Sequence, residues 1–257
     1  MTFVSGFRVD ELDVRVFATT AELGAAAAAD AASAIVEAIE RRGHANVMFA
    51  SGNSQFAFLD ALIARDDVAW EHLTGFHMDE YVGMDDTHTA SFARYMRERI
   101  VDRVHPYAFH YVDGTNGAAD ECARYAELLH EHPLDVCCLG IGENGHLAFN
   151  DPPFADFDDP VDVKEITLDD ASRAQQVDEG HFATIDDVPR TAITVTIPAL
   201  LRARRVLAIV PEARKADAVH RALEGSISTD CPASQLRRTP QATLYLDHAS
   251  AANISNV

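Results

Sequence analysis

Residues 136–152 have the sequence VCCLGIGENGHLAFNDP, in which a short apolar run leads directly into a glycine-rich turn. The run Val136–Leu139 is typical of a strand that is buried on both faces. Three glycines follow it closely, at Gly140, Gly142 and Gly145. Glycine allows a sharp turn and lets a ligand approach the backbone closely. The stretch therefore predicts a buried strand that ends at a ligand-binding loop.

Acid and base groups gather in the same loop. His146 supplies an imidazole and Asp151 a carboxylate, while Asn144 and Asn150 add uncharged hydrogen-bonding groups. A histidine alone is often only a structural hydrogen-bonding residue, but here several polar groups converge within eight residues. Such a loop at the carboxyl end of a parallel strand is a common place for an active site. We therefore expect acid/base chemistry here.

Short apolar runs alternate with helical patterns along the whole chain. The strands are expected at 13–17, 46–50, 74–77, 136–139, 165–168, 192–197, 206–210 and 242–246. Helices are expected from Thr19 to Gly43, from after residue 54 through 62, and at about 91–104, 118–130 and 212–223, the last ended by Gly225. This alternation predicts an α/β fold with a single doubly wound, mainly parallel sheet and helices on both faces, of the Rossmann-like kind. We expect residues 1–257 to form one domain.

The chain is strongly acidic. Its 257 residues include 41 acidic and 21 basic side chains, for a formal net charge of −20, and lysine occurs only at positions 164 and 215. A negative surface disfavours nucleic acid and anionic membranes as partners, because both carry the same sign of charge. Scattered acids with few lysines resemble proteins adapted to high salt, where ions screen self-repulsion. We expect activity and stability to be higher in concentrated salt than in dilute buffer.

The remaining composition indicates a cytoplasmic protein without a metal. No apolar run approaches the roughly 20 residues needed to cross a bilayer, and the first ten residues lack the order of a signal peptide. Cysteines stand at 122, 137, 138 and 231, without the CxxC spacing of a zinc site. Cys137 and Cys138 are expected to be buried thiols that point to opposite faces of their strand.

Two other expected strands lead into polar turns that could bind an anion. Ser51-Gly-Asn-Ser54 lies between a strand and the start of a helix, where backbone N–H groups and the helix dipole favour a phosphate. The same residues could instead be an ordinary helix cap. Lys215 begins a helix after the 206–210 strand and could hold an anion, or be a solvated surface lysine.

An acidic pair follows the strand at 74–77. Asp79 and Glu80 could include a catalytic base if one carboxylate is partly shielded from water. The alternative is a solvated acid pair in a loop.

Two motifs make the resemblance to a known family specific. FHMDEYVG at 76–83 and LGIGENGHLAFNDP at 139–152, with VPRTAITVT at 188–196 and Lys215, resemble the glucosamine-6-phosphate deaminase family, also called glucosamine-6-phosphate isomerases. The resemblance implies one deaminase-like domain over 1–257. It also implies isomerising deamination of D-glucosamine 6-phosphate to D-fructose 6-phosphate and ammonia. The implied partner is this small sugar phosphate, and no metal or organic cofactor is implied.

The resemblance also implies a role for each matching residue. Asp79 would move the C2 proton of the substrate to C1, and His146 would move a proton during opening of the pyranose ring. Asn144 and Asp151 would orient His146. The phosphate would be held by Ser51, Gly52, Asn53, Ser54 and Lys215.

The chain departs from the family pattern in several places. Asp151 stands where the family commonly has the longer glutamate. An arginine that binds phosphate in some members has no certain counterpart near 173–177. The acidic loop 154–162 lacks the basic residues used for allosteric activation in some relatives, so we expect no strong activation by N-acetylglucosamine 6-phosphate.

Other functions remain open at this stage. They are a 6-phosphogluconolactonase, an isomerase of another amino sugar phosphate such as galactosamine 6-phosphate, and a sugar-phosphate-sensing domain. A sensing domain would be expected to carry a DNA-binding helix-turn-helix, for which the N-terminus has neither the length nor the basic charge. The sequence does not decide between a monomer and a homo-oligomer.

Overall fold

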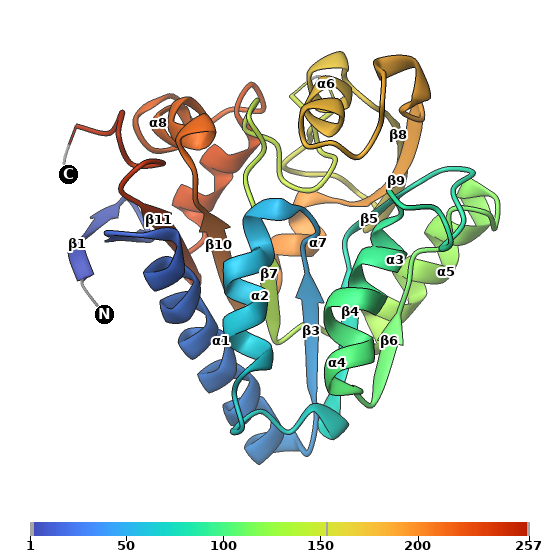
Figure 1. The fold of residues 1–257 in the computed structure, drawn as a ribbon, viewed down its shortest axis with the longest axis horizontal. Coiled ribbons are helices and arrows are strands. Elements are labelled where there is room, and N and C mark those ends of the chain that lie inside the picture. Colours follow the sequence, from blue (N-terminus) through green and yellow to red (C-terminus); the bar gives the residue numbers. More distant parts are fainter. Residues whose placement is uncertain (1–2, 153, 256–257) are drawn as a thin grey trace.

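The computed structural model describes residues 3–152 and 154–255, and its central feature is an eight-stranded sheet (Figure 1). The strand order is β1-β2-β11-β10-β7-β3-β4-β6. Neighbouring strands are parallel except for β1 and β2, which form an antiparallel hairpin. The strands are β1 (Phe3–Val9), β2 (Leu12–Phe17), β3 (Ala45–Phe49), β4 (Leu73–His77), β6 (Ala108–His110), β7 (Val136–Leu139), β10 (Arg205–Val210) and β11 (Ala242–Asp247). The predicted doubly wound, mainly parallel sheet is confirmed.

A second, antiparallel sheet was not foreseen from the sequence. It has three strands in the order β5-β9-β8, namely β5 (Asp79–Tyr81), β9 (Thr191–Val195) and β8 (Val163–Thr167). Asp79 and Glu80 thus belong to a buried strand, so the alternative of a solvated acid pair in a loop is wrong. Ile197, expected to end a strand, begins helix α7 (Ile197–Leu201) instead, because Pro198 sits in the first turn, where proline favours helix initiation.

Helices pack on both faces of the main sheet. The other helices are α1 (Thr20–Arg42), α2 (Phe56–Ile63), α3 (Phe92–Met96), α4 (Asp102–Val104), α5 (Ala118–Glu131), α6 (Asp170–Asp178) and α8 (Ala216–Glu224). A π-helical segment, Arg97–Val101, joins α3 to α4, so the helix expected at 91–104 is nearly continuous. Within the described residues, no helix is both long and apolar enough to span a bilayer.

Each face of the sheet has its own hydrophobic core. Leu23, Phe58 and Met96 bring α1, α2 and α3 together over one face, in the same cluster as Cys138. Cys137 belongs to the cluster on the other face, which includes residues of α5, α7 and α8. Adjacent strand residues point to opposite faces, so the two thiols are divided between the cores as predicted.

Local signals explain where the first and last long helices begin and end. The Thr19 side chain accepts a hydrogen bond of 3.2 Å from the Glu22 N–H, and Gly43 ends α1 with a φ of 81°. The last helix was expected from Glu212, but α8 begins only at Ala216, after a short 3-10 turn. Glu212 has a φ of 83°, outside the right-handed helical region, which delays the helix. The expected end at Gly225 is confirmed as the residue that follows α8.

The order of the strands determines where a ligand can bind. From β3 the chain continues to β4 and β6 on one side, whereas β7, β10 and β11 lie on the other side. Ligands of such sheets bind outside the carboxyl ends of the strands, at the point where the strand order reverses. The loops after β3 and β7 therefore open onto one crevice. The small sheet and α6 lie at the same end of the molecule (Figure 1).

A substitution at Gly24 tests how closely α1 packs on α2. A Cβ at Gly24 would lie 2.6 Å from the Ala57 carbonyl carbon, and this backbone atom cannot move aside easily. Alanine favours a helix over glycine by about 1 kcal/mol, but overpacking costs about 1–3 kcal/mol. We expect Gly24→Ala to lower the free energy of unfolding measured in urea. Ser33→Ala, on the exposed side of α1, is the control and should change it little; a gain for Gly24→Ala would contradict the packing argument.

Candidate active site

Segments that follow β3, β4, β7 and β10 line one cavity at this crevice. Six of the residues expected at the site contribute to its wall: Ser51, Gly52, Ser54, Asp79, His146 and Lys215. Asn144 and Asp151 are not part of the wall but contact His146 from behind. Asn53 belongs to the same turn as Ser51 and Ser54, but it is not part of the cavity wall. The structure thus brings together residues that are up to 164 positions apart, from Ser51 to Lys215.

His146 is held by a buried carboxylate. Its Nδ1 lies 2.8 Å from Asp151 Oδ1, and Asn144 Nδ2 donates to the same oxygen at 2.9 Å. The side-chain oxygen of Asn144 also accepts the His146 backbone N–H at 3.0 Å. Asp151 therefore reaches the imidazole despite being shorter than the glutamate common in the family.

Hydrogen bonds keep Asp151 ionised. Burial raises the pKa of Asp151, but the bonds from His146, Asn144 and Ser172 outweigh burial and hold that pKa below its ordinary value. An ionised Asp151 requires a proton on His146 Nδ1, which leaves Nε2 as the acceptor of the neutral imidazole.

The imidazole of His146 packs directly on Gly142. A Cβ at Gly142 would lie only 2.2 Å from His146 Nε2. Any larger residue would displace the ring, so this glycine is needed for close approach. Both residues line the cavity.

Asp79 and Glu80 have opposite environments. Glu80 accepts hydrogen bonds from Ser91 Oγ at 2.7 Å and from the Ala93 N–H at 2.9 Å, at the start of α3, as well as from the Tyr81 N–H. Asp79 is 6 % exposed and lines the cavity. Within residues 3–152 and 154–255 its carboxylate has no hydrogen-bond donor. Glu80 is thus a structural acid, whereas Asp79 is free to act on a ligand.

The environment of Asp79 raises its proton affinity. Burial, followed by repulsion from Glu80, raises the pKa of Asp79 to about 8. Groups with such perturbed pKa values cluster at functional sites, although structural acids can show them too.

Another part of the cavity wall suits an anion. Ser51 and Ser54 carry hydroxyl groups, and Gly52 has a φ of 109°, which few other residues adopt. This turn leads into α2, so its backbone N–H groups lie at a helix start. Lys215 is 3 % exposed, and in the described part of the chain its ammonium has no hydrogen-bond partner. Burial, and then the charge of Arg214, lower the pKa of Lys215.

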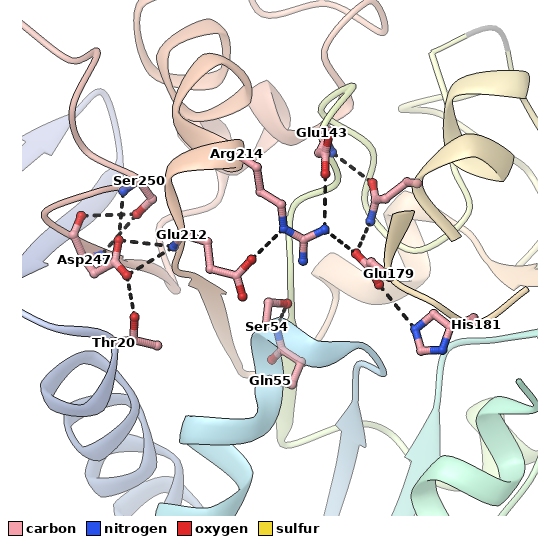
Figure 2. A network of polar contacts seen from close by, with 11 residues as sticks. Thr20, Ser54, Gln55, Glu143, Glu179, His181, Glu212, Arg214, Asp247 and Ser250 are labelled. Carbon is pink, nitrogen blue, oxygen red and sulfur yellow. Dashed lines mark hydrogen bonds and ion pairs between the residues drawn. The ribbon is translucent and has the colours of Figure 1, made fainter. Parts of the chain in front are cut away.

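A segment that the sequence analysis missed completes the wall. Gln175 and Gln176 of α6, with Glu179 and His181 just beyond it, line the cavity. The carboxylate of Glu179 accepts hydrogen bonds from Gln175 at 2.9 Å and from Arg214 at 2.7 Å, and Figure 2 shows the contact with Arg214. These residues do not follow a strand of the main sheet, so the strand-end argument could not find them. No motif in the sequence marks them.

Arg214 links three acidic residues around the cavity. Its guanidinium contacts Glu143 in the glycine-rich loop, Glu179 after α6 and Glu212 before α8 (Figure 2). Burial opposes ionisation of Glu179, but its bonds to His181 and Arg214 lower its pKa to about 2. The network joins loops that would otherwise repel one another.

Arg173 does not supply the missing phosphate-binding arginine. It is buried, and its guanidinium donates to the backbone carbonyls of Ile185 and Val188 at 2.5 and 3.3 Å. It is not part of the cavity wall. Nor does the described part of the chain contain a group of three or more His, Cys, Asp or Glu that could hold a metal ion.

Comparison with known proteins identifies the class. Residues 18–159 and 167–245 match the family described as glucosamine-6-phosphate isomerases/6-phosphogluconolactonase. The chain belongs to this enzyme family, and the resemblance found in the sequence is confirmed.

Within that family the chain is similar to glucosamine-6-phosphate deaminases. It is 31 % identical over 210 residues to the one from Lacticaseibacillus paracasei, covering 80 % of this chain and 85 % of the relative. It is 32 % identical over 224 residues to one from Listeria monocytogenes, covering 85 % and 92 %.

Solved structures agree with this placement. A monomeric glucosamine-6-phosphate deaminase superposes with a TM-score of 0.85 at 29 % identity, covering 94 % of this chain and 99 % of that one. A 6-phosphogluconolactonase from Shewanella baltica gives 0.75 at 19 % identity, covering 94 % and 99 %, and shows only the shared fold.

The raised pKa of Asp79 predicts that the stability of the folded protein depends on pH. Its folded pKa of about 8 lies above the ordinary value of 3.8, so the folded protein binds the extra proton between these values. The free energy of unfolding is therefore highest below pH 4, where Asp79 is protonated in both states, and it falls as the pH rises from about 4 toward 8. We expect Asp79→Asn to increase the free energy of unfolding by about 1–3 kcal/mol at pH 8 and far less at pH 4. Urea denaturation at the two pH values measures this difference, and an equal effect at both would contradict a buried, unpaired Asp79.

Proposed function

We propose that the protein catalyses the isomerising deamination of D-glucosamine 6-phosphate to D-fructose 6-phosphate and ammonia. The observation that carries this proposal is the placement of Asp79, His146 and Lys215 around one cavity. Each follows a different strand of the main sheet. A buried acid, an oriented imidazole and an unpaired cation can thus act on separate parts of one small substrate.

The phosphate binds at the Ser51–Ser54 turn and Lys215. The hydroxyl and N–H groups of the turn donate hydrogen bonds to phosphate oxygens, and the ammonium of Lys215 supplies the opposite charge. A dianionic ligand also favours the charged form of Lys215, whose pKa burial lowers. Fixing this end of the substrate orients its sugar ring between Asp79 and His146.

His146 opens the pyranose ring. Its Nε2 accepts the proton of the C1 hydroxyl and returns a proton to the ring oxygen, so C1 becomes an aldehyde. Asp151 holds Nδ1–H and stabilises the imidazolium that forms transiently. Ring opening is required first, because the C2 proton becomes acidic only beside the C1 carbonyl.

Asp79 carries out the isomerisation. Its carboxylate removes the proton from C2 of the open-chain substrate and delivers it to C1 of the resulting enolamine. The C2 imine is then hydrolysed by water to the ketone and ammonia. The raised pKa of Asp79 makes the carboxylate a stronger base than an ordinary aspartate. The cationic amino group of the substrate favours the ionised form of Asp79 when the complex forms.

Loss of the Asp79 carboxylate tests the chemistry directly. Coupled detection of ammonia and fructose 6-phosphate should show both products for the parent protein. Asp79→Asn preserves the shape of the side chain but removes the base, so we expect kcat to fall by about 10²–10⁴-fold. Asp60→Asn is the control: it changes an exposed carboxylate that pairs with Arg103 and is not part of the cavity wall, so kcat should stay within about threefold.

Two outcomes would contradict the proposal. One is undiminished turnover in Asp79→Asn. The other is a parent protein that hydrolyses 6-phosphogluconolactone and releases no ammonia from glucosamine 6-phosphate, which would favour the other activity named in the family description.

The two lysines of the chain provide a matched test of phosphate binding. Lys215→Met removes a buried ammonium at the cavity, so we expect KM for glucosamine 6-phosphate to rise about 10–100-fold, corresponding to one charge-assisted hydrogen bond. Lys164→Met removes a lysine that is not part of the cavity wall and whose Nζ lies 2.6 Å from Asp159 Oδ2. This substitution should not change KM. Equal effects of the two substitutions would contradict the assigned role of Lys215.

A further inference from the structure

Ser172 contacts both members of the His146–Asp151 pair. It is 1 % exposed and belongs to the first turn of α6. Its Oγ lies 2.5 Å from Asp151 Oδ1 and 3.0 Å from His146 Nδ1. No motif in the sequence drew attention to this serine, because it is 21 residues beyond Asp151.

The chemistry of the three groups allows one arrangement of protons. A serine hydroxyl can donate one hydrogen bond and accept others, whereas an ionised carboxylate only accepts. Ser172 therefore donates to Asp151, and the Nδ1–H of His146 points at both Asp151 Oδ1 and Ser172 Oγ. Both acceptors require the proton to be on Nδ1, so Ser172 favours the same tautomer as Asp151.

The start of α6 contacts both oxygens of the Asp151 carboxylate. Ser172 donates to Oδ1, and the Asp169 backbone N–H donates to Oδ2 at 3.4 Å. The same helix carries Gln175 and Gln176 to the cavity wall. Thus one helix both lines the substrate cavity and supports the acid that orients His146.

We propose that Ser172 is a positioning residue that orients His146 for ring opening by holding Asp151 and sharing the Nδ1 proton. This proposal rests on the proposed function and deepens it. It adds a third group to the support of His146 beyond Asn144 and Asp151. The hydroxyl does not line the cavity, so its effect reaches the substrate only through His146.

Kinetics of Ser172→Ala separate positioning from general support of the helix. We expect kcat for ammonia release to fall about 3–10-fold, the effect of one lost hydrogen bond, with KM within twofold of the parent. Displacement of α6 would instead raise KM, because Gln175 and Gln176 would leave the cavity wall. The control is Asp170→Ala in the same turn, whose exposed side chain contacts only Arg173 among the described residues and should leave both constants unchanged.

A spectroscopic measurement tests the same proposal without turnover. Imidazole ¹⁵N spectra of the parent should show His146 protonated on Nδ1, with slow exchange of that proton with water. In Ser172→Ala this proton should exchange faster, and in Asp170→Ala it should not. Unchanged exchange and unchanged kcat in Ser172→Ala would overturn the proposal, as would a raised KM with the parent kcat. A parent protein that releases no ammonia would defeat the proposed function, and the exchange measurement would still decide the role of Ser172.

Discussion

The parallel pairing of β3 with β7 is the constraint on which the site depends. These two strands are neighbours in the sheet although about 90 residues separate them, and the chain moves away from them in opposite directions. Their carboxyl ends therefore open a crevice that no crossing connection covers. The turn after β3 and the glycine-rich loop after β7 meet there because of the strand order, not because of any attraction between them. A change in strand order would separate His146 from the anion-binding turn even if every motif were kept.

The cavity keeps charges that would be costly without a ligand. Asp79 and Lys215 are almost fully buried, and neither has a hydrogen-bonding partner among the described residues. Burying an unpaired charge lowers stability, and the raised pKa of Asp79 and the lowered pKa of Lys215 are two forms of that cost. A substrate with a cationic amine and an anionic phosphate satisfies both groups. Glu80, in contrast, is buried beside Asp79 but accepts hydrogen bonds from the first residues of α3, so it stabilises the strand and affects Asp79 only through its charge.

The sequence was informative wherever a local pattern decides the outcome. The alternation of apolar runs with helices predicted the sheet, and Thr19 and Gly43 marked the ends of α1, because caps depend on a few adjacent residues. The strand-end argument also predicted six residues of the cavity wall. It failed for α6 and for Ser172, because α6 follows β8 of the small sheet and Ser172 contacts residues that are more than 20 positions away in the sequence. It predicted the position of Asp79 but not its secondary structure, because pairing of β5 with β9 makes this segment a buried strand and not a loop.

Because the chain is strongly acidic, attraction of an anionic ligand depends on the few cations near the cavity. A protein with a formal net charge of −20 repels a phosphate ester at long range, so attraction must arise close to the site. Arg214 pairs with three acids around the cavity and offsets part of their charge, and the pKa of Glu179 near 2 shows how firmly its ionised form is held. Lys215 is thereby left free for the ligand. Because salt screens exposed charges far more than buried ones, concentrated salt weakens the unfavourable surface field while Lys215 and the N–H groups of the turn keep their effect. Under the proposed function, the same buried contacts therefore hold the phosphate of the substrate at high as well as low ionic strength.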